Sequence, residues 1–547
     1  MRVESGRILT EKSPLVKNLS IESTHNSKMD KFDSLCVLEP QSAAKLSSKV
    51  EAAKSRHYHY AHSVPASRWC VNALIGFVCG IVSFFLKECI AFLFSMRASL
   101  ILSAAEGGGA WIATAWFHAW GFAALCLIVS ASTIIFFEPH AAGSGIPETC
   151  AFLNGVIIPK TFSLRVVLAK FTSCVLAVGS GIPAGPEGPM IHMGSILGSL
   201  VSQGQLFIGP HLEPLKAKIA HFRNISDRRD FMAAGVAGGV AAAFGAPIGG
   251  LLFVAEEIAS HFDMDLGMQI FLCSACACIT VELLTSAFEG FEYTGGFGMI
   301  KEDSAILFDV NKQISVNVLM FPPTILLGVL GGLLGALFNT LCLAATDFRG
   351  KYIKKYQTLF LLEPIGLAAV YITATIFIPT LFACQRPDCD GDPRSGEGCE
   401  RVGMALVSDG MAYGCPASGG QDGASYYNPS ATLMINSGEH VVKQLFARGF
   451  HYQFDYLPLL AMLFVYLPLS AYTNGIACST GIVVPCLLNG ALIGRIFGLL
   501  MTDMNGGVSD DETRQWIDPG AFALLGAASF FGGVARITVR TTDFPTF

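Results

Sequence analysis

The sequence predicts an all-α, polytopic membrane protein, and three observations lead to that class. Charged residues make up only 14% of the 547 residues, against roughly 25% in soluble globular proteins. Hydrophobic residues make up 52%, and they gather in runs long enough to enter or span a bilayer. Many runs are broken by Gly and Pro, as expected of helices that stop inside the membrane where irregular backbone lines an ion site.

The apolar runs follow a polar N-terminal tail and define the expected helices in order. Residues 1–68 hold 11 Lys/Arg and 7 Asp/Glu, a composition that predicts a largely disordered tail. We expect this tail in the cytosol, because no apolar signal region opens the chain. The predicted membrane segments lie near 70–103, 110–137, 164–182, 188–203, 231–258, 266–288, 318–345, 358–383, 455–473, 485–501 and 519–535.

The charge of the connecting loops predicts which side of the membrane each one faces. Basic residues cluster in 205–230 and in 346–357, the latter including Arg349, so both loops are expected in the cytosol. The 384–440 segment carries 8 acidic residues against 3 basic ones. We expect that segment on the lumenal or extracellular side.

Four cysteines of the acidic segment are disulfide candidates in an oxidising compartment, with three possible pairings. They are Cys384, Cys389, Cys399 and Cys415. A zinc site is the weaker alternative, because no His lies among them, and no metal is predicted. The net charge of −6 comes without a long basic stripe, so nucleic acid is not an expected partner. No nucleophile–base pair points to an enzyme.

Three Gly/Pro motifs begin apolar segments: 143–148 (GSGIPE), 185–189 (GPEGP) and 481–485 (GIVVP). Pro fits the first turn of a helix, and the preceding Gly lets the backbone turn sharply. Helix N-termini present unpaired N–H groups and partial positive charge, so three converging ends would bind an anion without Lys or Arg. A single motif of this kind is also typical of a plain turn or kink.

Two carboxylate positions lie where lipid or packed helix would penalise a charge. Glu187 stands between Gly and Gly-Pro at the head of an apolar segment, and intramembrane carboxylates are functional candidates by default. Ionised, it would occupy the anion site as a tethered anion, and protonated it would leave. The pair Glu256 and Glu257 ends the 231–258 run; the alternative role for this pair is snorkelling to the membrane surface.

Four runs of sequence resemble the CLC family of chloride channels and chloride/proton exchangers, most closely its endosomal–lysosomal branch. They are FFEPHAAGSGIPETCAFLNGV, GPEGPMIHMGS, AAFGAPIGGLLFVAEE and TGIVVPCLLNGALIGRIFG, in the family's order, and the resemblance covers roughly 70–540. It implies a homodimer with two separate anion pathways. Each pathway would be built from two inverted repeats of tilted, partly spanning helices.

The resemblance also implies roles for single residues. Ser144 would offer its hydroxyl to the central anion, and Glu187 would be the external gating glutamate. Glu257 would be the internal proton-transfer glutamate that exchangers carry. The candidate anion-binding residues are Ser144, Gly145, Ile146, Pro147, Gly185, Gly188, Pro189, Ile482 and Val483. His192 is expected to be structural.

The implied domain order follows from the same resemblance. The first membrane repeat would be 69–288, and the second would comprise 318–383 and 455–547. Lumenal or extracellular loops would fill 289–317 and 384–454.

The sequence departs from the family pattern in three places. Pro186 stands where a Lys or Arg commonly precedes the gating glutamate, and Val483 stands where Phe is usual. After Val539 we expect the family's last helices, its central Tyr and its nucleotide-binding CBS domains to be missing. The chain is therefore predicted to be truncated and to bind no cofactor.

The function predicted is chloride transport by chloride/proton antiport in an acidic intracellular compartment, endosomal or lysosomal, with the plasma membrane as the alternative. Chloride, protons and lipid are the expected partners, in a homodimer or a heterodimer with a longer relative. Two other functions stay open: a passive gated chloride channel, and a non-transporting subunit that assembles with a full-length relative.

Overall fold

The chain folds into packed helices. The computed structural model describes residues 66–105, 111–156, 158–205, 222, 224–259, 262–289, 291–293, 295–298, 317–385, 413–415, 427–448, 453–505 and 516–536. The predicted N-terminal tail, apart from its last three residues, lies outside the described residues. Cys389 and Cys399 also lie outside them.

Most described residues are helical. The α-helices are α4 (Ala66–Ala105), α5 (Trp111–Ser132), α6 (Ile146–Leu153), α7 (Leu164–Gly179), α8 (Glu187–Ser202), α10 (Ile225–Phe244), α11 (Pro247–Phe253), α12 (Met264–Ala287), α14 (Phe321–Phe348), α15 (Gln357–Phe377), α17 (Pro429–Ile435), α18 (Gly438–Phe446), α19 (Tyr456–Thr473), α20 (Val483–Met504) and α21 (Pro519–Ala535). π-Helical turns are η1 (Thr133–Phe137), η5 (Val254–Ile258) and η7 (Arg349–Ile353); 3₁₀ turns are η2 (Pro139–Ala141), η6 (Val318–Met320) and η8 (Ile378–Leu381). Strands β1 (Phe288–Glu289) and β2 (Glu292–Tyr293) form a short antiparallel pair.

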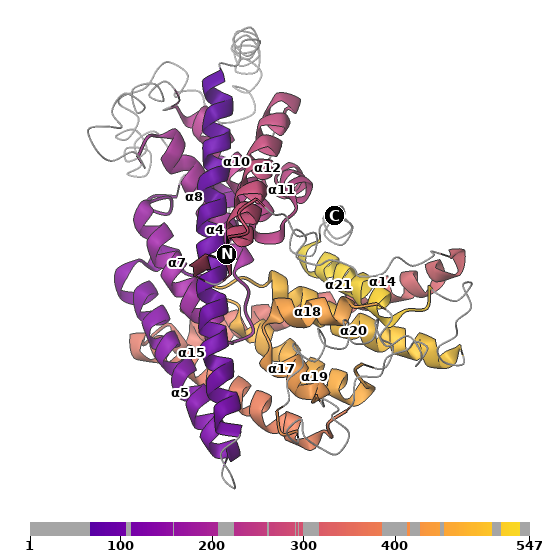
Figure 1. Ribbon diagram of the computed structural model, residues 1–547. Helices are drawn as coiled ribbons and strands as arrows, with labels where there is room; N and C mark the ends of the chain where they lie inside the picture. The colour runs from indigo at the N-terminus through magenta and orange to yellow at the C-terminus, as the bar shows by residue number, and fades with distance from the viewer. Residues whose placement is uncertain are drawn as a thin grey trace, which may run out of the picture.

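The helices have the lengths and surfaces of membrane segments. Seven helical spans of the described chain are long and apolar enough to cross a bilayer, while α6, α8 and α11 are shorter. Large apolar side chains such as Leu333 and Leu343 of α14 are about two-thirds exposed, a surface that lipid would cover. Figure 1 shows α4 running along the molecule, with α5, α7 and α8 on one side and α14, α20 and α21 on the other.

Glycines make the closest helix contacts. A Cβ on Gly194 of α8 would overlap the carbonyl oxygen of Gly235 in α10, and one on Gly526 of α21 would overlap that of Gly490 in α20. In lipid, where no hydrophobic drive brings helices together, such small residues let backbones approach. The α8–α10 and α20–α21 pairs therefore form the interior of the two halves.

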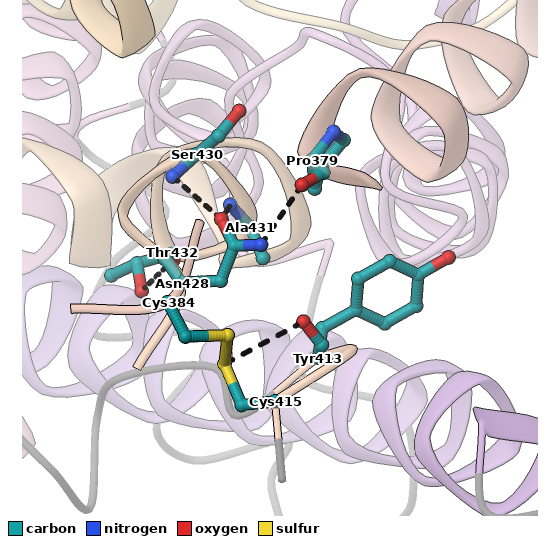
Figure 2. The surroundings of a disulfide bond; sticks show 8 residues. All are labelled: Pro379, Cys384, Tyr413, Cys415, Asn428, Ser430, Ala431 and Thr432. Atoms are coloured by element: carbon teal, nitrogen blue, oxygen red, sulfur yellow. Dashed lines mark hydrogen bonds between the residues drawn. A yellow bond between two sulfur atoms is a disulfide. The ribbon is translucent and has the colours of Figure 1, made fainter. Parts of the chain in front are cut away.

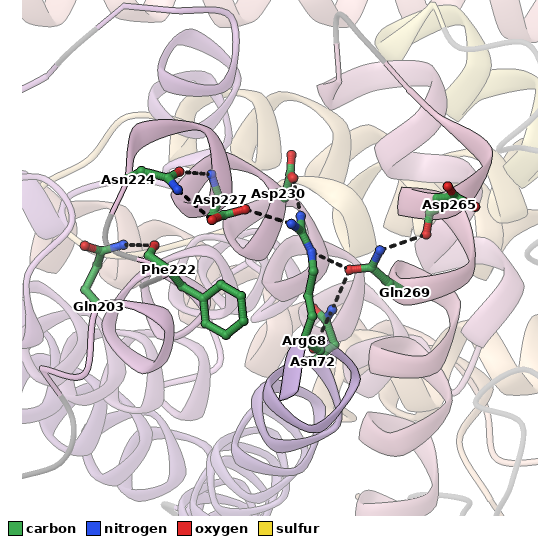
Figure 3. A network of polar contacts seen from close by, with 9 residues as sticks. All are labelled: Arg68, Asn72, Gln203, Phe222, Asn224, Asp227, Asp230, Asp265 and Gln269. Carbon is green, nitrogen blue, oxygen red and sulfur yellow. Dashed lines mark hydrogen bonds and ion pairs between the residues drawn. The ribbon is translucent and has the colours of Figure 1, made fainter. Parts of the chain in front are cut away.

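A polar network fastens one end of α4 to two other helices (Figure 3). Arg68 donates to Asp227 of α10 at 2.7 Å and to Gln269 of α12 at 2.8 Å, and it also pairs with Asp230. Asn224 caps α10 by accepting a hydrogen bond from the Asp227 amide at 2.7 Å. This network fixes where the first described helix begins.

Arg349, one of the basic residues of the predicted 346–357 loop, is buried. Its side chain is 1% exposed and pairs at 2.7 Å with Glu363 of α15, itself 3% exposed. Its guanidinium also donates to the carbonyls of Asn474 and Tyr472 at the end of α19. A buried arginine with a carboxylate and two carbonyls is satisfied without water. The neighbouring Lys354 is exposed.

One of the three possible cysteine pairings is present in part. Cys384 and Cys415 form a disulfide with their Cα atoms 5.8 Å apart. Figure 2 shows it beside Asn428, which caps α17 through the amides of Ser430 and Ala431, each at 3.1 Å.

The predicted 384–454 loop contains two helices that the sequence did not suggest. All residues of α17 are buried, and five of the nine in α18 are. Their shortness explains the miss, because neither presents an apolar run of membrane-spanning length. The first turn of α18 packs beside Val484 at the start of α20, near the site described below.

Candidate anion and proton site

All three Gly/Pro motifs lie at helix N-termini, as the sequence predicts. Gly145 caps α6, Pro186 caps α8 and Ile482 caps α20. The first N–H groups of each helix lack an acceptor within their own helix. Pro147 and Pro189 lie in the first turns of α6 and α8, where proline is favoured. Because they carry no N–H, these two candidate residues cannot donate a hydrogen bond to an anion.

Backbone hydrogen bonds hold the second and third motifs together. Gly185 N donates to Gly481 O at 2.9 Å, and Gly481 N donates to Gly185 O at 2.8 Å. The first motif is bonded to the residues just before the third motif: Gly143 N donates to Cys478 O at 3.0 Å. Segments from both halves of the chain thus meet at one place.

Gly188 marks the point where the three motifs cross. A Cβ on Gly188 would lie 2.8 Å from the Cβ of Ser144 and 3.2 Å from the Cα of Gly481. A Cβ on Gly481 would in turn lie 2.9 Å from Gly188 N. The absence of side chains at both positions keeps the Gly188 amide open toward Ser144. Ser144 Oγ accepts from Ile146 N at 3.4 Å, so its O–H remains able to donate.

Glu187 is the first residue of α8 and is buried, with 1% exposure. Neither carboxylate oxygen receives a hydrogen bond from the described chain. One oxygen lies against the Cα of Gly185, where a Cβ would overlap it. A buried carboxylate with no donor is costly unless it is protonated or moves. Its position fits a side chain that exchanges between protonated and ionised states.

Glu257 lies apart from this crossing, on the π-helical turn η5. The side chain of Glu257 is partly buried, whereas that of Glu256 is exposed. Helix α6, which begins at the first motif, contacts both α8 and η5. π-Turns of this kind are frequent at functional sites.

Lys170 is a site residue that the sequence prediction missed. It lies in α7, is fully buried, and donates from Nζ to Gly143 O at 2.8 Å. A lone lysine within the 164–182 apolar run is the signal that could have identified it. Its ammonium places a positive charge directly behind the Ser144 loop.

His192 packs where the sequence analysis expects a structural residue. Its ring meets Phe162 edge-on at 5.5 Å and covers Gly145, which adopts φ = 77°. A Cβ on Gly145 would overlap this ring, so Gly is required there both by conformation and by space. Among the described residues, no cluster of three or more His, Cys, Asp or Glu side chains could hold a metal.

Comparison with known proteins relates these features to one family. The family profile described as "Voltage gated chloride channel" matches residues 125–542. The human "H(+)/Cl(-) exchange transporter 7" is 33% identical over 488 residues, which cover 88% of this chain and 56% of that protein. "Chloride channel protein D" of Dictyostelium discoideum is 31% identical over 538 residues, covering 87% and 51%. The chain thus spans about half the length of the curated relatives it matches.

Solved structures share the fold. A cyanobacterial Cl⁻/H⁺ antiporter aligns with a TM-score of 0.62 and 18% identity, over 87% of this chain and 88% of its own. A eukaryotic CLC transporter aligns with a TM-score of 0.57 and 21% identity, over 87% and 66%. At these identities the likeness concerns architecture alone.

Proposed function

The chain belongs to the voltage-gated chloride channel (CLC) family, and from that premise we propose that it exchanges chloride for protons across a membrane. The observation that carries this proposal is Glu187, buried without a donor where three helix N-termini meet. An anion site of backbone amides next to a protonatable side chain can couple the two ions. The relatives named as H⁺/Cl⁻ exchangers support the same reaction.

Chloride would be held at the crossing of the three motifs. The Gly188 amide, the Ser144 hydroxyl and the amides of Ile482 and Val483 at the start of α20 would supply the donors. Lys170 would add positive charge near the first motif, where its Nζ donates to Gly143 O. Such a site binds an anion without trapping it in a direct ion pair.

Glu187 would compete with chloride when ionised and carry a proton when neutral. Glu257 would pass protons between Glu187 and the cytosol, across the space beside α6. Its partial burial on η5, compared with the exposed Glu256, supports this assignment. The compartment we propose is an acidic endosome or lysosome, and the assembly a dimer, with a second copy or with a longer relative.

A passive channel would use the same amides but would not couple protons. Glu257 argues against this second candidate, whereas Pro186 and Val483, which depart from the family pattern, leave it open. The two candidates differ in whether a chloride gradient drives protons uphill.

The test is a flux assay on the purified full chain in liposomes, with a chloride electrode and a lumenal pH dye. We expect a chloride gradient to drive proton movement in the unmodified chain. Glu187→Ala should lose proton movement and keep chloride flux, and Glu257→Gln should do the same. Glu256→Gln is the matched control and should leave both fluxes unchanged.

The outcomes separate the candidates. Reversal potentials that ignore pH would favour the passive channel, and no flux of either ion would favour a non-transporting subunit. Proton movement that persists in Glu187→Ala would contradict its gating role. Loss of chloride flux together with proton flux in Glu257→Gln would argue against a role limited to protons.

A further inference from the structure

A second carboxylate, Glu439, faces Glu187 from the other half of the chain. It lies in the first turn of α18, whose N-cap is Ser437. Its side chain is partly exposed, whereas that of Glu187 is buried. The sequence analysis assigns it no role beyond one acidic charge of the 384–440 segment.

Val484 connects the surroundings of the two carboxylates. A Cβ on Gly185, where the Glu187 carboxylate rests, would lie 3.1 Å from the Cβ of Val484. A Cβ on Gly438, the residue before Glu439, would lie 2.9 Å from a methyl carbon of the same valine. The first turn of α18 therefore packs directly beside the Glu187 pocket.

Among the described residues, the Glu187 carboxylate receives no hydrogen bond from another residue. Glu439 is the charged side chain that acts most strongly on Glu187, within side-chain hydrogen-bonding reach, and Lys87 of α4 acts more weakly. The hydroxyl of Tyr466 in α19 and the thiol of Cys174 in α7 also face the pocket. On α18 itself, Lys443 is exposed one turn beyond Glu439.

Two carboxylates within hydrogen-bonding reach of each other cannot both be ionised without strong repulsion, but one proton shared between them forms a hydrogen bond. The missing donor of Glu187 is then supplied by the proton itself. Ionised Glu439 would be stabilised by the N-terminus of α18. The partly exposed carboxylate can exchange with water, and the buried one cannot.

We propose that Glu187 and Glu439 form a proton-sharing carboxylate pair, and that protons reach and leave Glu187 through Glu439. When a proton moves from Glu439 to Glu187, an O–H bond on Glu439 breaks as an O–H bond on Glu187 forms. This transfer leaves Glu439 as a carboxylate. Glu439 then takes its next proton from water on its own side of the membrane. The role of Glu439 in proton transport rests on the proposed antiport. The sharing of a proton between the two carboxylates does not depend on it.

Two measurements test the pair. In liposomes, Glu439→Gln should keep chloride flux and reduce proton flux by roughly 100-fold, the scale of one acid–base group, and Glu439→Asp should restore part of it. In the purified full chain, infrared titration should show two coupled carboxyl steps, and Glu187→Gln or Glu439→Gln should each leave one. Glu256→Gln is the control and should leave both coupled steps.

The infrared titration tests whether Glu187 and Glu439 share a proton even if the chain transports no protons. A Glu187 carboxyl that titrates identically in the unmodified chain and in Glu439→Gln overturns the proposal. Absent proton flux in the unmodified chain, with the two coupled steps present, counts against the antiport and supports the pair. Unchanged proton flux in Glu439→Gln overturns the route through Glu439.

Discussion

The proposed anion site depends on glycines, whose missing side chains let the three motifs approach one another. Gly188 and Gly481 face each other across the crossing of the motifs, and a Cβ on either would press on backbone of the other. Glu187 places a buried carboxylate at this crossing, and the Lys170 ammonium bonds to Gly143 O of the first motif. In the proposed site, selectivity would come from amide dipoles together with these charges.

Gly481→Ala is predicted to block the site while the fold persists. Its Cβ would lie 2.9 Å from Gly188 N and 3.0 Å from Gly185 O, and crowding of this kind costs about 1–3 kcal/mol. We expect chloride affinity, measured by isothermal titration, to fall, with a modest drop in the unfolding temperature. Gly328→Ala is the control, since a Cβ there meets nothing within 4 Å. Unaltered chloride binding in Gly481→Ala would place the anion elsewhere.

At the scale of elements, the site lies at the N-termini of helices that each pack against a partner helix. Helix α8 begins at Glu187 and is supported by α10, and α20 begins at Val483 and is supported by α21. Each supporting contact is made through glycines. The position of a helix N-terminus therefore depends on how closely its partner helix approaches.

Gly526→Val is predicted to separate α21 from α20. Its side chain would overlap the carbonyl oxygen of Gly490 and the backbone of Gly494, which costs about 1–3 kcal/mol or more in the free energy of unfolding. Thermal unfolding in detergent measures this. Gly366→Val, where a Cβ meets nothing within 4 Å, should change stability far less. Equal stability of the two variants would show that the α20–α21 contact is loose.

At the scale of the whole molecule, the two halves are joined around the site by Arg97 of α4. Its buried guanidinium donates to Ser180 O at 3.1 Å and to Ile435 O at 2.8 Å. Ser180 precedes the Glu187 motif, and Ile435 precedes α18. One side chain thus fixes the spacing between the segments that carry Glu187 and Glu439.

Arg97→Lys is predicted to loosen this spacing. A lysine has one nitrogen and cannot reproduce the planar fork that reaches both carbonyls, and losing a charged hydrogen bond costs about 1.5–3 kcal/mol. We expect a lower unfolding temperature and a smaller ratio of protons to chloride transported. Arg165→Lys, at an exposed position of α7, is the matched control. A transport ratio equal to that of the unmodified chain would remove Arg97 from this role.

The sequence by itself determined the membrane class, the approximate bounds of the long helices and the Gly/Pro starts of α6, α8 and α20. These features are local, because apolar length, Pro at a first turn and Gly before it act within a few residues. The buried place of Glu187 also followed from its neighbours in the chain. The helices α17 and α18 could not be predicted from the sequence, since their burial depends on the other helices that pack around them.

Only the tertiary structure decided which distant groups meet. The pairing of Gly185 with Gly481, the burial of Arg349 and the approach of Glu439 to Glu187 all join segments far apart in the sequence. Their energies arise from removing charges and amides from water together, and a sequence pattern does not record which partners share that burial. The scarcity of charge predicted a membrane protein, and the tertiary structure brought segments from both ends of the chain together around Glu187.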